Sequence, residues 1–579
     1  MYYGRGGELE YDFEIAPGAN PSAIRMRFDG ADRIALNQRG DVVLTLGDGQ
    51  IVQRTPVVYQ RRASGEIVSV PSRYRMDRRG DVHVVLSEYH RSEALIVDPA
   101  LTYSAYLEGS STDVAIAVAH DSKGNIYLAG NTMSSDFQAI TSDTAYQATY
   151  GSLGDAWVMQ VNPGSNTITY CTYLGGGAID TVKAMTVDAN GVIYLTGSTD
   201  SENYPTSSNA FQGTIPSNTH VFVTMLDPSQ AGAAGLVYST FIGGANNEEG
   251  DAITVVNGKI YVTGFTTSDD FPTVNPTQSA RVAGFDGFVS EFDPTQSGTA
   301  SLLFSTFLGA DGQDLPHSIA VDSAGEIYVA GITYSTAFPT TPTSYQPFYT
   351  GDGDGFLTRL NPATATMDYS TYLGGSFIDD VKKIAIEPNG HVALSGLTLS
   401  PDFPISAGAL QPSFPSTHCN PNPATVCPSM AFLTILDLTA TAPLVQGLVY
   451  STYFGGTGGD VALDLHRDPA GRYVLGGYTY SIDFPITANA LNGTSSGLGP
   501  DGFIAILDPT KPPYSPQQLV YSSYVTGPGF QAVYGVDVDA SGTIYATGFS
   551  TSNLFPSSAA QNPDTSGKMS AFVLAFTLP

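Results

Sequence analysis

The chain has 579 residues, a formal net charge of −30, 13% charged and 42% hydrophobic residues, 62 glycines and 37 prolines. This composition excludes a disordered polyampholyte and a long-helix protein, and it is typical of short strands joined by turns. The acidic excess would repel a phosphate backbone, and the sequence contains no run of about 18 apolar residues. We therefore expect no nucleic acid partner and no membrane span.

The first 98 residues differ in composition from the rest of the chain. Residues 1–100 contain 13 arginines, no lysine and 14 acidic residues, whereas the remainder contains 11 basic and 40 acidic residues. In residues 8–15, ELEYDFEI, apolar and polar side chains alternate, and residues 42–53 have the pattern of a β-hairpin. We predict a small, partial β-sandwich-like module of unknown function at 1–98, followed by a second domain at 99–579.

From Tyr103 onward, one phrase recurs seven times, 65 to 81 residues apart. Its copies are YSAYL at Tyr103, YCTYL at Tyr170, YSTFI at Tyr238, FSTFL at Phe304, YSTYL at Tyr369, YSTYF at Tyr450 and YSSYV at Tyr521. Most units also contain a D-x-x-G turn such as Asp322–Gly325, in which the aspartate bonds the following backbone and the glycine adopts a positive φ. In the third unit, Asn257 and Gly258 predict a two-residue hairpin at the same place.

Each unit contains four predicted strands, which in the second unit cover residues 180–188, 192–199, 220–227 and 236–243. The last of these strands has bulky side chains on both faces, Tyr238 on one and Phe241 on the other, so both faces must be covered. Four-stranded sheets arranged radially as blades meet this requirement. We predict an all-β fold, a seven-bladed β-propeller of four-stranded antiparallel blades, in which residues 101–109 supply the outer strand of the last blade and close the ring.

Units such as YSTYLGG followed by IAVDSAGEIYVAGITYSTAFPTT and DGFLTRLNP resemble the SBBP repeats of bacterial β-propeller proteins, over about residues 101–579. The stretch from YYGRGGELEYDFEI to RSEALIVDPALTYS is similar to the domain of unknown function that commonly precedes these repeats. The resemblance implies an exported or cell-surface bacterial protein without a generally defined activity. Because that leading domain usually begins further upstream, we expect an export signal to lie before Met1.

One position carries an acidic residue in most units, eight residues before the D-x-x-G turn. The residues are Asp113, Asp180, Asp314, Asp379 and Asp460, with Glu248 and Gln531 nearest to this position in the third and seventh units. In a propeller they would form a ring at one mouth of the channel, beside His317, where crowded carboxylates could bind a ligand or a cation. The alternative is that each acid accepts backbone N–H bonds in the turn before its strand.

Two smaller features complete the candidate sites. Asp352 and Asp354 lie in a Gly-Asp-Gly-Asp-Gly stretch that is compatible with calcium, or that simply forms the turn before a strand. Cys419 and Cys427 bracket an inserted loop, and we expect a disulfide there in an oxidising compartment, with free thiols as the alternative. We expect no other cofactor.

The sequence shows no group of catalytic residues that is distinct from the pattern shared by the repeats. The leading hypothesis is a non-enzymatic, monomeric scaffold outside the cell or on its surface, which binds a protein or carbohydrate through loops on one propeller face. The competing hypothesis is a polysaccharide hydrolase or lyase, with Asp314, Asp379 and Asp460 converging at the channel mouth. A catalytic site would break the seven-fold pattern with a deep pocket and with acids in unlike environments.

Overall fold

The structure is a computed structural model of the whole chain. It describes all residues except 1, 6, 7, 12, 29–32, 37–41, 47, 48, 54–56, 62–66, 78, 88, 93, 94, 99–102, 138–143, 163–166, 216, 217, 416–427, 441–446, 488, 553–567, 578 and 579. Cys419 and Cys427 lie outside the described residues, so the disulfide stays a prediction.

The N-terminal region is built from short strands in four small sheets. The sheets are β1 (Tyr2–Arg5) with β2 (Glu8–Tyr11); β10 (Ser72–Met76), β11 (Val82–Leu86) and β4 (Arg25–Met26); β3 (Phe13–Ile15), β12 (Leu95–Asp98), β8 (Val57–Arg61) and β9 (Ile67–Ser69); and β5 (Arg33–Leu36), β6 (Val42–Leu46) and β7 (Gly49–Gln53). Residues 8–15 therefore belong to two strands in different sheets. The predicted hairpin at 42–53 is confirmed as β6 and β7.

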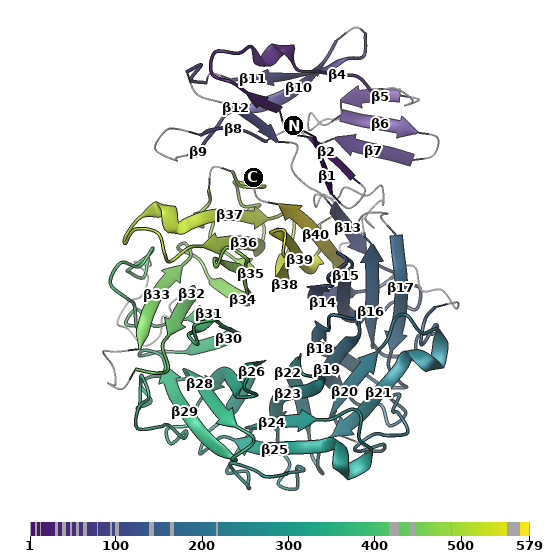
Figure 1. Cartoon of the computed structure of the whole chain (residues 1–579), viewed down its shortest axis with the longest axis vertical. Helices are drawn as coiled ribbons and strands as arrows, with labels where there is room; N and C mark the ends of the chain where they lie inside the picture. Colours follow the sequence, from purple (N-terminus) through teal and green to yellow (C-terminus); the bar gives the residue numbers. More distant parts are fainter. Residues whose placement is uncertain are drawn as a thin grey trace.

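The described strands that follow form seven four-stranded antiparallel sheets, which surround a common centre as the blades of a propeller (Figure 1). Six sheets are continuous in sequence: β14 (Asp113–His120), β15 (Ile126–Thr132), β16 (Asp155–Asn162) and β17 (Thr167–Leu174); β18 (Asp180–Val187), β19 (Ile193–Thr199), β20 (His220–Leu226) and β21 (Leu236–Ile242); β22 (Glu248–Val256), β23 (Lys259–Thr266), β24 (Asp286–Phe292) and β25 (Leu302–Leu308); β26 (Asp314–Val321), β27 (Ile327–Thr333), β28 (Asp354–Asn361) and β29 (Thr366–Leu373); β30 (Asp379–Ile386), β31 (Val392–Thr398), β32 (Met430–Leu436) and β33 (Leu448–Phe454); β34 (Asp460–Arg467), β35 (Tyr473–Thr479), β36 (Asp501–Leu507) and β37 (Leu519–Val525). Short 3-10 helices lie at Pro21–Ala23, Gly232–Gly235, Gly298–Ser301 and Pro516–Gln518.

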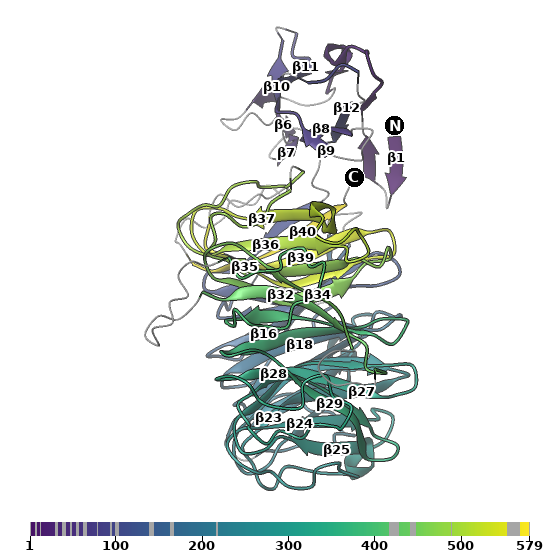
Figure 2. The ribbon, with the colours of Figure 1, turned by 90° about the vertical axis from the view of Figure 1, so that its left-hand side faces the viewer.

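The last sheet joins the two ends of the propeller sequence. It contains β38 (Gln531–Val538), β39 (Thr543–Ser550), β40 (Ser570–Thr577) and, as its fourth strand, β13 (Tyr103–Leu107). β13 pairs antiparallel with β40, with Ala105 opposite Val573, which is the partner that the strand count predicts. The first strand of each blade contacts the first strands of its two neighbours, and β38 contacts β14, so the described strands form a closed circle. The N-terminal sheets lie beside this ring, next to β37 and β40 (Figures 1 and 2).

Hydrophobic clusters between the blades hold the ring together. One cluster combines Val221 and Val223 of β20 with Ile260, Val262 and Phe288 of the next blade. Tyr238 and Phe241, on opposite faces of β21, are both fully buried, so the two-sided cover predicted for these strands is confirmed. The all-β propeller fold is confirmed as well.

The predicted turns are also confirmed. Asp322 Oδ1 accepts the N–H groups of Ala324 and Glu326, at 2.9 and 3.0 Å, and Gly325 has a φ of +87°. Asn257 and Gly258 both have positive φ, at 52° and 74°, and join Val256 directly to Lys259. The four strands predicted for the second unit agree with β18 to β21 to within one residue at each end.

Candidate functional site

The five predicted aspartates, Asp113, Asp180, Asp314, Asp379 and Asp460, each begin the first strand of a blade and are at most 1% exposed. Each accepts bonds from a threonine that ends the second strand, from the serine two residues later, and from a backbone N–H four residues upstream. For Asp314 the donors are Thr333 Oγ1 at 2.5 Å, Ser335 Oγ at 2.8 Å and Ala310 N at 2.8 Å. This geometry matches the alternative in which the acid holds a turn.

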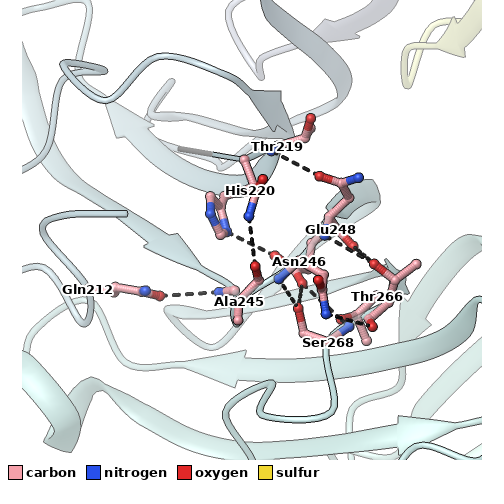
Figure 3. Close-up of polar contacts among 12 residues, drawn as sticks. Gln212, Thr219, His220, Ala245, Asn246, Glu248, Thr266 and Ser268 are labelled. Carbon is pink, nitrogen blue, oxygen red and sulfur yellow. Dashed lines mark hydrogen bonds and ion pairs between the residues drawn. The ribbon is translucent and has the colours of Figure 1, made fainter. Parts of the chain in front are cut away.

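Glu248 begins the first strand of the third blade, and Figure 3 shows it among its polar contacts. Its carboxylate accepts the hydroxyl groups of Thr266, at 3.1 Å, and Ser268. Its other oxygen lies 2.9 Å from Nδ1 of His220, and both side chains are fully buried. His220 was not anticipated from the sequence, although it starts the third strand of its unit, where four other units have aspartate.

These acids meet a residue of the preceding blade, which the sequence did not reveal. The N–H of Asp180 donates to Gly154 O at 2.9 Å, and the same bond recurs around the ring, so the first residue of each first strand lies beside the first residue of the preceding third strand. We call these seven combinations interface pairs: Asp155 with Asp180, His220 with Glu248, Asp286 with Asp314, Asp354 with Asp379, Met430 with Asp460, Asp501 with Gln531, and Ser570 with Asp113.

Three interface pairs consist of two carboxyl groups. A Cβ atom placed on Gly175 would lie 2.6 Å from Asp155 Oδ1 and 2.8 Å from Asp180 Oδ2, so both carboxyls close over this glycine. The same holds for Gly374, under Asp354 and Asp379. At these two places the repeat phrase is followed by glycine, because a side chain would displace the acids.

Burial raises the pKa of several interface acids. The pKa values of Asp155, Asp286 and Asp354 rise to about 6, and that of Asp379 rises to about 7, in each case mainly through burial. The partner carboxylate of the pair adds to the shift for Asp155, Asp286 and Asp379, whereas Asp402 adds to it for Asp354. Burial also raises the pKa of Asp460, which faces Met430, to about 7. Since two like charges repel each other in a buried site, these carboxyl groups bind a proton at a higher pH than an exposed aspartate does.

The structure does not bring Asp314, Asp379 and Asp460 together. The carboxyl group of each accepts bonds from a threonine and a serine of its own blade and is fully buried, so a polymer has no access to them. Asp352 is exposed whereas Asp354 is fully buried beside Asp379, so these two residues do not converge either. Among the described residues, no group of three or more His, Cys, Asp and Glu side chains could hold a metal ion. Calcium binding remains an untested prediction.

A different set of side chains lines the centre of the propeller. In all seven first strands, the pairing with the second strand shifts by one residue at the same place, which is a β-bulge. A bulge leaves one residue unpaired and redirects its side chain. The unpaired residues are Ile116, Lys183, Asp251, His317, Lys382, Leu463 and Tyr534, and all of them line a central cavity of about 450 Å³. We call them the bulge ring.

The bulge ring has two unlike halves. Lys183, Asp251, His317 and Lys382 come from four consecutive blades and form a polar arc, whereas Leu463, Tyr534 and Ile116 come from the other three and form an apolar arc. The strands and bulges around the channel repeat closely from blade to blade. The side chains that line the channel, by contrast, differ in charge and polarity among the seven blades.

Acidic residues stand beside the polar arc. Lys183 Nζ lies 2.8 Å from Glu249 Oε1, and Lys382 Nζ lies 2.6 Å from Asp380 Oδ2. Asp380 Oδ1 is also 3.4 Å from His317 Nε2. Burial lowers the pKa of His317 to about 4, so its imidazole is neutral at physiological pH. Burial, together with the neighbouring Glu249 carboxylate, raises the pKa of Asp251 well above its usual value.

A second polar cluster lines the channel nearer the other ends of the first strands. Asp537 bridges two histidines, with Oδ2 2.6 Å from His120 Nδ1 and Oδ1 3.1 Å from His466 Nε2. The bond to Asp537 raises the pKa of His120. Lys383 Nζ lies 3.1 Å from Asp464 Oδ1.

Of these channel residues, the sequence had singled out only His317, and as a neighbour of the acidic ring. One signal could have revealed the others: in an alignment of the seven units, the third position after the first residue of the strand varies from Ile to Lys, Asp, His, Leu and Tyr. Its direction depends on the bulge, which leaves no mark of its own in the sequence.

Comparisons with known proteins agree on the architecture. A domain of unknown function, DUF7948, matches residues 1–100, and the SBBP β-propeller repeat matches residues 102–138 and 169–205. No curated protein matches the chain. Within the described part of the chain, no helix has the length and apolar character needed to cross a bilayer.

Several solved structures are similar at low identity. The extracellular domain of the putative hybrid two component system BT4673 from B. thetaiotaomicron is 8% identical with a TM-score of 0.37; the match covers 94% of this chain, which spans about half, 52%, of that longer chain. The polysaccharide lyase Uly1 is 9% identical over 80% of this chain and 90% of its own, with a TM-score of 0.40. YCF48 bound to D1 peptide is 8% identical over 82% and 95%, with a TM-score of 0.36. By the family models, residues 1–100 are similar to DUF7948, and the first part of the propeller, within residues 102–205, is similar to the SBBP β-propeller repeat.

Proposed function

We propose that this protein is a non-enzymatic, monomeric binding scaffold of the cell exterior, which holds a protein or carbohydrate ligand at the central channel and at the loops around its mouth. The observation that carries the proposal is the asymmetry of the bulge ring within an otherwise repetitive framework. Concave sites with a few converging polar groups are where proteins bind ligands. Its place outside the cell rests on the resemblance of its repeats to those of exported proteins.

The loops on one face support the same proposal. The first strands begin on this face, and most of the exposed large hydrophobic side chains of the described residues lie in its loops, among them Met133, Ile179, Tyr334, Phe377, Tyr480 and Phe530. Ile179 and Phe530 directly precede first strands, whereas Tyr334 and Tyr480 directly follow second strands, so these residues lie near the mouth of the channel. Exposed apolar groups around a cavity favour an interaction site.

The proposal is tested by filling the channel. The double variant Ile116→Trp/Leu463→Trp places two large rings in the cavity, and Val237→Trp/Val449→Trp adds the same rings on exposed fourth-strand positions as a control. Both variants and the unaltered protein are incubated with fractionated glycans and proteins of the source cell envelope, and bound material is identified by mass spectrometry. We expect the channel variant alone to lose the ligand. A ligand retained equally by both variants, or no ligand for any of them, would refute the proposal.

The alternative is a polysaccharide hydrolase or lyase. Because Asp314, Asp379 and Asp460 are buried, other acids of the channel would have to act in it. Glu249 and Asp251 are in unlike environments, since Glu249 is paired with Lys183 whereas the pKa of Asp251 is raised by burial. Their carboxyl groups hydrogen-bond to each other, however, whereas glycosidases separate theirs by roughly 5 to 10 Å. This geometry makes the enzyme the second candidate. Turnover of a polysaccharide by the unaltered protein that Asp251→Asn abolishes would establish it.

A further inference from the structure

The ligand class follows from how the channel balances its charges; this inference rests on the proposed function. Each lysine of the channel has a carboxylate partner: Lys183 with Glu249 at 2.8 Å, Lys382 with Asp380 at 2.6 Å and Lys383 with Asp464 at 3.1 Å. The ammonium groups are therefore compensated within the protein. An ionic ligand would have to separate these pairs, whereas a neutral ligand need not.

The polar arc places hydrogen-bond donors beside acceptors. Ammonium groups of Lys183 and Lys382 donate, the carboxyl group of Asp251 accepts, and the neutral imidazole of His317 can do both through its two nitrogens. A hydroxyl group also donates and accepts at once. A ligand with several neighbouring hydroxyl groups thus matches this arc better than one with donors or acceptors alone.

A buried nitrogen atom without a hydrogen-bond partner also favours a ligand that forms hydrogen bonds. His466 lines the channel, and its Nε2 is occupied by Asp537 at 3.1 Å. Its Nδ1 is buried and has no hydrogen-bond partner among the described residues. A buried polar atom without a partner costs free energy unless a ligand or water satisfies it.

The apolar arc lies across the channel from the polar arc. The ring of Tyr534 is held against Phe549, with centroids 5.7 Å apart, and its neighbours in the arc are Leu463 and Ile116. An aromatic face with aliphatic neighbours covers the C–H face of a flat polar ligand. The cavity of about 450 Å³ also falls in the range of small-molecule sites, roughly 300 to 1,000 Å³.

We infer that the central channel binds an uncharged sugar unit, which rests on the apolar arc at Tyr534 and hydrogen-bonds to the polar arc through its hydroxyl groups. The face of a sugar ring that carries C–H groups corresponds to the apolar arc of the bulge ring. The edge that carries hydroxyl groups corresponds to the polar arc. The ligand is then a neutral saccharide and not an acidic or amino sugar.

Calorimetric titration of the full chain tests this inference, with cellobiose, maltose and lactose as neutral probes and with glucuronic acid and glucosamine as charged ones. We expect a neutral probe to bind and the charged ones to bind at least about tenfold more weakly. Tyr534→Ala should weaken binding by about tenfold or more, whereas Tyr534→Phe, which keeps the ring, should change it by less than about threefold. Tyr514→Ala is the matched control, because Tyr514 is an exposed tyrosine outside the cavity.

The outcomes separate this inference from the proposed function. Preferential binding of a charged sugar, or binding of a neutral sugar that Tyr534→Ala leaves unchanged, would overturn the inference. If no sugar binds but the channel-filled variant still loses an envelope ligand, the proposed function stands and the sugar is refuted. If neither experiment detects a channel ligand, both are refuted.

Discussion

In five of the seven blades, a buried aspartate at the start of the first strand accepts several hydrogen bonds. Asp314 satisfies two hydroxyl groups and one backbone N–H at the junction between blades, and none of these donors can reach water. Removing the acceptor leaves them unpaired, and each unpaired buried group costs about 1–3 kcal/mol. An aspartate fits here, because its two oxygens reach all three donors.

Asp314→Ala is therefore expected to lower the free energy of unfolding by at least about 2 kcal/mol, measured by urea denaturation. Binding of a channel ligand to the folded variant should be unchanged, since Asp314 does not line the cavity. Asp368→Ala is the control, because Asp368 is exposed and its loss should cost under about 0.5 kcal/mol. If Asp314→Ala abolished binding without a change in stability, the acid would have a direct functional role.

At the scale of blades, the interface pairs make the ring sensitive to pH. The pKa values of Asp155, Asp286 and Asp354 are about 6 in the folded protein, and those of Asp379 and Asp460 are about 7. In an unfolded chain they would be about 4. The folded protein thus binds more protons between these values, so this contribution to stability is present at low pH and is lost as the pH rises through about 6 to 7.

We expect the melting temperature to be a few degrees higher at about pH 5 than at about pH 8, measured by circular dichroism. His317 opposes this trend, because its lowered pKa favours the folded state above its unfolded pKa. The triple variant Asp155→Asn/Asp286→Asn/Asp354→Asn should flatten the dependence, since each pair then has no second carboxyl to protonate. Met430 and Ser570 show that the fold accepts neutral residues at this position. A triple variant with an undiminished pH dependence would contradict the assignment.

At the scale of the whole molecule, one strand from near the start of the propeller completes the blade that contains its last strand. β13 pairs with β40 over five residues, and the buried Tyr106 donates its hydroxyl to Ser552 O. Without β13, the edge of β40 would be exposed, and an unpaired strand edge invites association with other chains.

Ala105→Pro should open this closure, because proline removes a backbone donor in the middle of the strand. We expect a lower melting temperature and increased aggregation in light scattering. Tyr106→Phe removes only the hydroxyl bond and is the milder control, with an expected loss of about 1 kcal/mol. If both variants melted at the temperature of the unaltered protein, the ring would not depend on β13.

Local features of this protein follow from its sequence alone. The D-x-x-G and Asn257-Gly258 turns depend only on neighbouring backbone and side-chain groups. The recurring phrase allowed the strands to be located and counted. The two-sided burial of Tyr238 and Phe241 followed from strand alternation. By contrast, residues 8–15 alternate as one strand would, yet they divide between two sheets because pairing partners decide strand ends.

What only the tertiary structure decided is which side chains meet. Asp155 and Asp180, or His220 and Glu248, come from different blades and lie more than 20 residues apart, so their proximity depends on the curvature of the ring. The bulge ring depends on seven local shifts in strand pairing that redirect one side chain per blade toward the axis. Short-range hydrogen bonding thus determined the blades from sequence, whereas the chemistry of the channel arose only when distant blades were brought around one axis.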